Sequence, residues 1–287
     1  MTYELAIGDR TYSSWSLRGW LMFAKWDITV RVRTARLYSD ELPQLLKDFA
    51  PARLVPAMKK DGIVVHDTLA MAETLAEAYP ERNMWPAQAS ARATARSITA
   101  EMHSGFGALR EACPMNLAHT WAGFEPSPEV LADCARIEEL WQRALTHSDG
   151  PWLFGDYSLA DVFYAPIATR FATYDLPRGA VAARYIDTVL SDRTFRQWRA
   201  MGLAENHHQP FYDMPLAKGD WPGPEAVPAR AVEGGPAEND ACPYSGKPVT
   251  HFLETGGRVY GFCNAFCRDK TVADPEAWPR FTDMLSA

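Results

Sequence analysis

The chain has 287 residues and a formal net charge of -7 at pH 7. This length can bury an ordinary core without disulfides and predicts one large domain or two ordinary ones. Because basic residues are scattered through an acidic chain, a nucleic-acid partner is not expected. No run reaches the roughly 18 apolar residues of a membrane span, and the N-terminus lacks a basic region before an apolar run. We therefore expect a cytoplasmic protein with no membrane partner.

Residues 1–82 alternate strand and helix patterns. The short apolar run YELAIG precedes residues spaced as on a helix, and the alternating run ITVRVRTAR is typical of a half-buried strand. After a second helical piece, two short apolar runs flank Asp61-Gly62, a dipeptide typical of hairpin turns. Thr68 then precedes another helical pattern. The order predicts a small α/β domain.

Residues 88–212 are expected to be helical, and strand patterns are absent from about Ser90 to Glu205. One apolar stripe contains Cys134 and is opened by Ser127, an N-cap residue followed by Pro at the first helical position. In SLADVFYAPIATRF, Ser158 and Asp161 have the spacing of a capping box. The second half is predicted to be an all-helical domain, with Cys113 and Cys134 as small core residues.

A connector and a small tail are expected after this domain. Residues 213–240 contain five prolines and four glycines with little apolar periodicity, which predicts a semi-extended linker. Residues 241–287 contain the strand-like run RVYGFC, a Gly256-Gly257 pair that suggests a hairpin, and a helical segment. A unit of this size rarely folds on an apolar core alone.

Five motifs resemble cytosolic glutathione transferases. YSSWSLRGW is similar to the Ser-Ser-Cys-x-Trp-Arg segment of zeta-class enzymes, the maleylacetoacetate isomerases. LVPAM resembles the cis-proline turn of the family, HDTLAMAETL its Glu-Ser helix start, AEMHSGFGALRE its Glu-Ile-His-Ser-Gly segment, and GDYSLADV its capping motif. The resemblance implies a thioredoxin-like α/β N-terminal domain followed by the all-α transferase domain.

The serine-rich segment is the candidate catalytic site. The thiol of glutathione has a pKa near 8.5 and is a poor nucleophile while protonated. A hydroxyl hydrogen bond at a helix N-terminus favours the thiolate. Ser13 aligns with the activating serine of the family, and Ser14 and Tyr12 are neighbouring alternatives. A run of hydroxyls is also typical of a simple helix cap.

The resemblance also implies the glutathione-binding residues. Val55-Pro56 is expected to be a cis peptide bond, with the backbone of Val55 facing glutathione. Asp67 and Thr68 replace the Glu-Ser of the family and are expected to hold the γ-glutamyl ammonium and carboxylate groups. Arg53 occupies a position where the family often uses a polar side chain. Asp67 and Thr68 are equally compatible with a helix cap.

The second substrate, a small electrophile, is expected between the two domains. The candidate lining residues are Trp15, His103, Phe106, Arg110 and Arg170. Arg170 resembles a zeta-class arginine that faces an acidic substrate, and a guanidinium is well shaped for a carboxylate. Trp15 replaces the cysteine of the family, a departure that affects the isomerase assignment more than glutathione binding.

Three cysteines in the tail have metal-ligand spacing. Twenty residues separate Cys242 from Cys263, and three separate Cys263 from Cys267. The pattern resembles TRASH/YHS-type domains and implies a small α+β, treble-clef-like metal-binding fold. Thiolates suit zinc and equally Cu(I). Ser245, His251, water or a partner's side chain are the candidates for a fourth ligand, and redox-active thiols or a metal-free fold are the alternatives.

Together these features predict a glutathione transferase-like enzyme, a homodimer by resemblance. It would activate the glutathione thiolate for conjugation or for cis–trans isomerisation of a small, possibly acidic, electrophile. The alternative is a non-catalytic, transferase-like scaffold that acts as a metal- or thiol-responsive adaptor.

Overall fold

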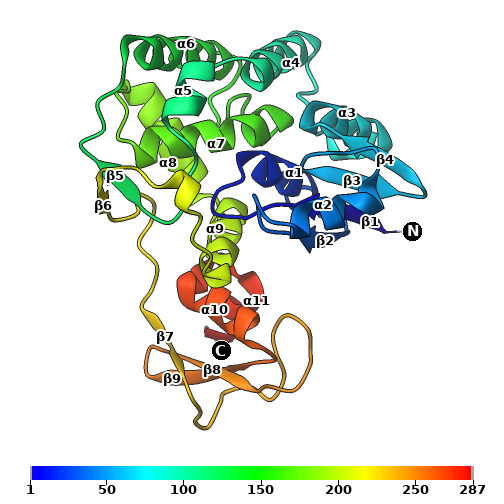
Figure 1. The fold of residues 1–287 in the computed structure, drawn as a ribbon, viewed down its shortest axis with the longest axis vertical. Coiled ribbons are helices and arrows are strands. Elements are labelled where there is room, and N and C mark those ends of the chain that lie inside the picture. Colours follow the sequence, from blue (N-terminus) through cyan, green and yellow to red (C-terminus); the bar gives the residue numbers. More distant parts are fainter. Residues whose placement is uncertain (1, 286–287) are drawn as a thin grey trace. The chain divides into compact units, whose positions relative to one another are not determined.

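The computed structural model of the protein describes residues 2–285 and divides into two compact units. The N-terminal unit contains Met1–Leu190 and Gln209–Pro222, and the C-terminal unit contains Ser191–His208 and Gly223–Ala287. Figure 1 shows their elements. Within residues 2–285, no helix is long and apolar enough to cross a membrane.

A four-stranded sheet forms the first part of the N-terminal unit, in the order β2-β1-β3-β4. The strands are β1 (Tyr3–Ile7), β2 (Val30–Thr34), β3 (Ala57–Lys60) and β4 (Ile63–His66). β1 pairs with β2 in parallel and with β3 antiparallel. The β3–β4 pair is the predicted hairpin, and its Asp61-Gly62 turn has φ of 50° and 81°, as a tight two-residue turn requires.

Helix α1 (Ser14–Ala24) packs against α3 (Thr68–Ala78), while α2 (Glu41–Leu46) lies between β2 and β3 in the chain. The Val55-Pro56 bond is cis, as predicted, and Ala50-Pro51 is also cis. A Cβ atom at Gly19 would lie 2.8 Å from the ring of Pro56. A larger residue at position 19 would therefore separate α1 from the proline turn.

The second part of the N-terminal unit is helical, drawn in green in Figure 1. Its helices are α4 (Ala89–Ser104), α5 (Gly107–Ala112), α6 (Pro128–Leu145), α7 (Leu159–Thr173) and α8 (Ala180–Ser191). Every residue of α7 is buried, and α7 packs against both α4 and α1. α7 is therefore the element that joins the helical part to the sheet-containing part.

The predicted caps are confirmed. The Ser127 side chain accepts a hydrogen bond from the N–H of Val130 at the start of α6. At the start of α7, Asp161 accepts hydrogen bonds from the N–H and hydroxyl of Ser158 at 2.8 and 3.0 Å. Burial raises the pKa of Asp161 to about 6, although hydrogen bonds from its neighbours oppose the shift. The capping box is therefore part of the core.

Three short strands correct the expectation that residues 90–205 lack strands and that residues 213–240 are unfolded. β5 (Thr120–Ala122) pairs antiparallel with β6 (Ala217–Gly219), and β7 (Ala229–Val232) forms the edge of another sheet. Strands of three or four residues are too short for a clear period-two pattern, and β5 and β6 lie far apart in sequence. Their pairing could not be recognised from local composition.

The C-terminal unit contains a three-stranded sheet, β7-β8-β9. β8 (His251–Thr255) and β9 (Arg258–Phe262) form the predicted hairpin, whose Gly256-Gly257 turn has φ of 56° and 75°. The helices of the unit are α9 (Arg193–Glu205), α10 (Ala265–Ala273) and α11 (Pro279–Leu285). Its buried core includes Leu253, Tyr260, Phe262 and Phe281, together with Ala200 of α9. The tail thus shares a core with a helix that precedes the connector.

A buried ion pair joins α9 to the tail. The Arg196 guanidinium donates to both carboxylate oxygens of Asp274, at 2.8 and 2.7 Å. Their side chains are only 16% and 7% exposed. Gln197 donates to the carbonyl of Ala277 at 2.7 Å, and Figure 1 shows α9 and α10 side by side in this unit. The tail is therefore anchored to α9 by polar contacts as well as by apolar packing.

We expect Arg196→Met to lower the free energy of unfolding of the C-terminal unit by about 3 kcal/mol, because it leaves the buried Asp274 carboxylate unpaired. Hydrogen exchange of the β8 and β9 amides in increasing urea measures this change. Arg136→Met is the control, because the Arg136–Glu101 pair is 48% and 37% exposed; it should cost the N-terminal unit less than about 1 kcal/mol. Equal effects of the two variants would contradict the role given to the buried pair.

Candidate functional site

Ser13 lies at the N-terminus of α1. Its Oγ accepts the N–H of Ser16 at 3.2 Å and donates to Ser16 Oγ at 2.8 Å. Ser16 Oγ also accepts the N–H of Gly8 at 2.9 Å. Ser13 is therefore a helix cap, which was the simpler of the two readings of the sequence, and its hydroxyl also lies at the positive end of the helix.

The two alternatives to Ser13 have different surroundings. Ser14 is the first residue of α1 and is buried. Tyr12 is also buried; its ring centre lies 4.8 Å from that of Tyr212, and its hydroxyl accepts the backbone N–H of Gln209. Burial raises the pKa of Tyr12 above its usual value. The phenol therefore stays protonated at neutral pH.

Asp67 is the residue that caps α3, and its backbone has an unusual φ of 84°. Oδ1 accepts the N–H groups of Leu69 and Ala70 at 2.8 and 3.3 Å. The carboxylate is 45% exposed, so it combines a cap with access to solvent. A positive φ at a residue other than glycine is often associated with a functional site.

Thr68 and the loop before β3 complete the predicted glutathione site. Thr68 is fully buried, and its Oγ1 has no hydrogen-bond partner within residues 2–285. Val55 is half-buried, Pro56 is buried, and Arg53 is exposed. A buried hydroxyl without a partner is costly unless a ligand or water pairs with it. The predicted contact with a carboxylate of glutathione requires this oxygen to become accessible to the ligand.

His103 connects the helical part to Asp67. Its Nε2 lies 3.1 Å from Asp67 Oδ2, and its ring meets that of Trp15 edge-on at 5.3 Å. Burial lowers the pKa of His103, although the charge of Asp67 opposes this shift. A neutral His103 at pH 7 can donate its Nε2 hydrogen to Asp67. The sequence did not predict this link between the two groups of candidate residues.

Trp15 lies close to two guanidinium groups. The centre of its ring is 4.4 Å from the Arg18 guanidinium carbon and 5.0 Å from that of Arg110. Arg18 also lies 5.4 Å from the ring of Phe163 on α7. Arg18 is fully buried, and none of its three side-chain nitrogens has a hydrogen-bond partner in the described part of the chain. The charge of Arg18 is therefore stabilised by the neighbouring aromatic rings of Trp15 and Phe163.

Arg170 and Phe106 are also buried, at 4% and 6% exposure. Arg170 donates to the carbonyls of Cys113 at 2.8 Å and Pro166 at 3.0 Å. Burial lowers the pKa of Arg170 to about 10, and the neighbouring charge of Arg110 adds to this shift. Within residues 2–285, no carboxylate forms an ion pair with Arg18, Arg110 or Arg170. The charge of Asp67 acts on Arg18 without forming an ion pair, so the predicted acceptor region carries three cationic groups against one nearby carboxylate.

Arg18 was missed as a candidate in the sequence. Two signals were present: the zeta-class motif ends in arginine where this chain has SSWSLR, and Arg18 is four residues after Ser14. Residues at this spacing share one face of a helix. The face of α1 that carries Ser14 and Arg18 therefore meets the helical part.

The three tail cysteines lie together. Their Sγ atoms are all within 4.8 Å of one another, and Cys263 and Cys267 are 3.9 Å apart. Cys263 follows β9, and Cys267 lies in the first turn of α10, whose cap Asn264 accepts the Cys267 N–H. Two sulfurs bound to one tetrahedral zinc at about 2.3 Å would lie about 3.8 Å apart. The donor set fits such an ion.

The structure distinguishes between Ser245 and His251, the two side-chain candidates for the fourth metal ligand. Ser245 Oγ lies 3.2 Å from Cys263 Sγ, while the His251 ring pairs with Thr250 at 2.9 Å and is outside the cysteine group. Burial would raise the pKa of Cys242, but hydrogen bonds from the backbone N–H groups of Cys263, Tyr244 and Ser245 lower it to about 7. The loop therefore favours a thiolate at Cys242.

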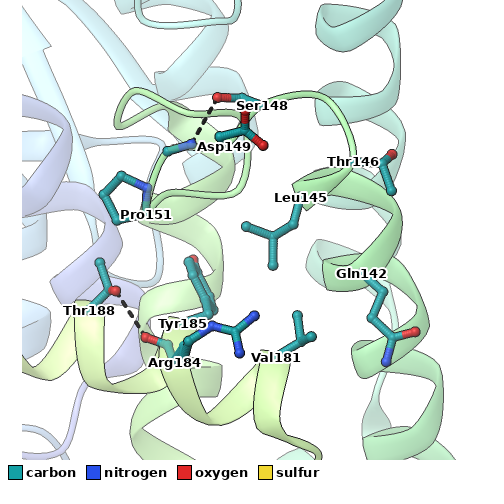
Figure 2. Close-up of a pocket in the computed structure, with 11 residues that line it drawn as sticks. Gln142, Leu145, Thr146, Ser148, Asp149, Pro151, Val181, Arg184, Tyr185 and Thr188 are labelled. Carbon is teal, nitrogen blue, oxygen red and sulfur yellow. Dashed lines mark hydrogen bonds between the residues drawn. The ribbon is translucent and has the colours of Figure 1, made fainter.

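A separate cavity of about 620 Å³ lies between α6, α8 and the loop before α7. Figure 2 shows its lining, including the Ser148–Gly150 and Thr188–Arg184 hydrogen bonds. None of the predicted site residues lines it, and its polar groups are turn and helix contacts. It therefore does not belong to the candidate site.

The comparisons with known proteins agree with this arrangement. A family model described as the N-terminal domain of glutathione S-transferase matches residues 12–78. A Caenorhabditis elegans protein described as "Probable maleylacetoacetate isomerase" is 33% identical over 170 residues, covering 56% of this chain and 77% of that protein. The chain belongs to the glutathione transferase superfamily.

Solved glutathione transferases share the fold. A homologue from Burkholderia gl BGR1, solved with bound glutathione, has a TM-score of 0.56 at 21% identity and covers 71% of this chain and 99% of its own. Transferase Omega 2S from Trametes versicolor has a TM-score of 0.56 at 18% identity, covering 74% and 99%. The predicted fold, a thioredoxin-like part followed by a helical part, is thus confirmed, whereas the predicted metal-binding tail is supported by its cysteine cluster alone.

The buried guanidinium of Arg18 leads to a prediction about stability. We expect Arg18→Met to raise the free energy of unfolding by about 1–2 kcal/mol, because it replaces a buried charge without a polar partner by an apolar side chain of similar length. Urea denaturation measures the change. Arg170→Met is the matched comparison and should be destabilising, because Arg170 bonds two carbonyls that would lose their donor. A destabilised Arg18→Met protein would contradict this view of Arg18.

Proposed function

We propose that this transferase binds glutathione as the thiolate and transfers it to a small electrophile that carries negative charge. The proposal is supported by the Ser13 hydroxyl at the start of α1, by the unpaired Thr68 hydroxyl at the start of α3, and by the Arg18 and Arg110 guanidinium groups beside Trp15. The first two fit glutathione, and the arginines fit an anion.

Ser13 is the proposed hydrogen-bond donor to the glutathione sulfur. Its hydroxyl hydrogen now points to Ser16, and a rotation about the Cβ–Oγ bond of Ser13 redirects this hydrogen to a bound sulfur while the oxygen keeps its place at the helix cap. The hydrogen bond and the α1 N-terminus both favour the thiolate. In conjugation the sulfur attacks the electrophilic carbon, a C–S bond forms, and the leaving group departs with its electron pair. In isomerisation the same sulfur adds to a double bond and leaves after rotation.

The rest of glutathione is assigned to the neighbouring residues. Val55, next to Pro56, would pair with the peptide backbone of the ligand, and Arg53 would reach it from the exposed loop. Thr68 would hold the γ-glutamyl carboxylate at the N-terminus of α3, and Asp67 the ammonium. The exposed Asp67 carboxylate and its hydrogen bond to His103 support this assignment. We also propose a homodimer, by analogy with the superfamily.

The proposed acceptor region contains Trp15, Phe106, Arg110 and Arg170, with Arg18 behind Trp15. The charge on these arginines favours acidic acceptors, including the cis-unsaturated acids of a zeta-like isomerase. The relative described as an isomerase supports that reaction. Trp15 fills the position of the family cysteine, which supports conjugation as an equal candidate.

Ser13→Ala tests the catalytic assignment. With glutathione bound, we expect the wild-type thiol to have a pKa below its free value of about 8.5, and the variant to raise it back toward that value. Thiolate absorbance against pH measures the shift. The rising limb of kcat against pH should move to higher pH, and turnover of maleylacetone or chloroacetate at pH 7 should fall about 10-fold to 100-fold.

Ser14→Ala is the matched control because Ser14 is also buried at the helix start. If Ser13→Ala leaves turnover unchanged and Ser14→Ala lowers it, then Ser14 rather than Ser13 activates the thiol. If no electrophile turns over while glutathione still binds, the scaffold alternative replaces the enzyme.

We further propose that residues 241–287 form a TRASH/YHS-like domain that holds zinc through Cys242, Cys263 and Cys267. The distance between two of the sulfurs and the hydrogen bonds to Cys242 support this. When bound, zinc would cross-link the loop, the end of β9 and the start of α10. The Ser245 hydroxyl, 3.2 Å from Cys263 Sγ, or a water molecule would then be a neutral fourth ligand.

Cobalt substitution tests the metal site. We expect one Co²⁺ per chain with thiolate charge-transfer and tetrahedral d–d absorption, and the Cys242→Ser, Cys263→Ser, Cys267→Ser triple variant should lose both. Loss of metal should also lower the stability of the unit, since metal binding supplies folding free energy. Cys134→Ser is the control, because Cys134 lies in α6. Metal-free protein that binds no Co²⁺ would refute the zinc proposal without affecting the glutathione site.

A further inference from the structure

Asn264 contacts two of the three clustered cysteines in the tail. It is the residue between Cys263, which follows β9, and helix α10. Its Nδ2 donates a hydrogen bond to Cys263 Sγ at 3.4 Å, and its Oδ1 accepts the backbone N–H of Cys267 at 2.8 Å. A backbone N–H can only donate, so the second bond identifies the oxygen of the amide and leaves its NH2 group toward the sulfur. One side chain therefore holds both cysteines of this pair.

The two hydrogen bonds of Asn264 have different purposes. Capping of α10 requires only the amide oxygen, because a cap accepts a backbone N–H, and asparagine, aspartate and serine are about equally good caps. Helix α9 in the same unit is capped by Asp192. An aspartate at position 264 would cap equally well, but it would place a carboxylate against the sulfur of Cys263. Asn264 supplies an N–H there instead, a group that the cap alone does not require.

Cys263 is held by further polar contacts. Its Sγ accepts a second hydrogen bond, from the Ser245 hydroxyl at 3.2 Å, and its carbonyl accepts one from Thr250 Oγ1 at 3.1 Å. Its backbone N–H is one of the groups that bond the sulfur of Cys242. Cys263 therefore connects the loop that carries Cys242 to the start of α10, and the two bonds to its sulfur orient its side chain.

Three thiolates at this site repel one another, because their sulfurs lie within 4.8 Å of one another. A divalent metal with a neutral fourth ligand would still leave one negative charge in excess. A hydrogen bond to an ionised group favours the ionised form and offsets part of its charge. Groups that hydrogen-bond the ligands of a metal also orient them, and their loss lowers metal affinity. The N–H of Asn264 is placed to do both for Cys263.

We propose that Asn264 is a positioning residue of the tail metal site, and that its N–H bond to sulfur holds Cys263 as a thiolate within the cysteine group. This inference rests on the proposed zinc site and adds a residue that is not itself a ligand. Asn264 acts on the metal through Cys263, and its cap holds the turn that carries Cys267.

The test makes the same substitution at two asparagines of the C-terminal unit, in the full-length reduced protein. Asn264→Ser keeps an oxygen for the helix cap and removes the amide N–H. Asn239→Ser is the matched control, because the Asn239 amide bonds the backbone of Ala241 and Gly261, each at 2.8 Å. Co²⁺ affinity is measured by titration and Zn²⁺ affinity by competition. The thiolate-to-cobalt charge-transfer band reports on the sulfurs themselves.

We expect Asn264→Ser to lower the affinity for both metals about 10-fold, the lower end of the range for such contacts, because Asn264 is exposed. Its charge-transfer band should move to lower energy, since a thiolate that loses an N–H bond holds its electrons less tightly. Hydrogen exchange of the β8 and β9 amides in the metal-free protein should match the wild type, because the cap is retained. Asn239→Ser should lower this protection and leave the energy of the band unchanged.

The outcomes separate this inference from the zinc proposal. If the wild type binds no Co²⁺, the zinc site and the role of Asn264 both fail. If the wild type binds Co²⁺ and Asn264→Ser has the same affinity and the same band, the zinc site stands and Asn264 is only a helix cap. A weaker Asn264→Ser site with an unshifted band would also overturn the inference, because that is the result expected of a purely structural loss.

Discussion

The close approach of α1 to the turn at Pro56 is the contact on which the rest of the N-terminal unit depends. Gly19 allows it, because any Cβ at this position would meet the proline ring. The approach fixes the start of α1, and with it Ser13, relative to Val55. Elsewhere on α1, the helix faces α7, and there the Arg18 guanidinium lies 5.4 Å from the centre of the Phe163 ring. One helix therefore sets the positions of Ser13, Val55 and Arg18 relative to one another, and with them the geometry of the proposed site.

The proposed site is positively charged, whereas the chain as a whole is negatively charged. The protein carries a net charge of -7, yet three arginines without carboxylate partners lie beside Trp15 and α7. A buried guanidinium loses hydration, and aromatic rings replace only part of it. In a region of low polarity, the remaining attraction for an anion is stronger than at the surface. This attraction is the physical basis for the acidic acceptor that we propose.

Local signals were sufficient for much of the fold. The Asp61-Gly62 and Gly256-Gly257 turns, the Ser127 cap and the Ser158–Asp161 capping box each depend on a few adjacent residues, and all four were predicted. The short strands β5 and β6 were missed, because their stability comes from pairing across a long loop. For the same reason the sequence did not reveal that Gln209–Tyr212 returns to Tyr12. The burial of Arg18 was missed for another reason. Apolar periodicity indicates which apolar residues are buried, and it does not indicate that a charged residue among them is buried too.

The two compact units are interleaved along the chain. Residues 191–208 belong to the C-terminal unit, residues 209–222 return to the N-terminal unit, and the chain then passes to the C-terminal unit again. α9 contributes Ala200 to the core that contains Cys242, and Arg196 to the pair with Asp274. A gene that gained or lost the tail by a single break after Pro222 would thus separate α9 from its partners. Exchange of this unit between proteins requires two breakpoints, or a recipient whose last transferase helix already suits the tail.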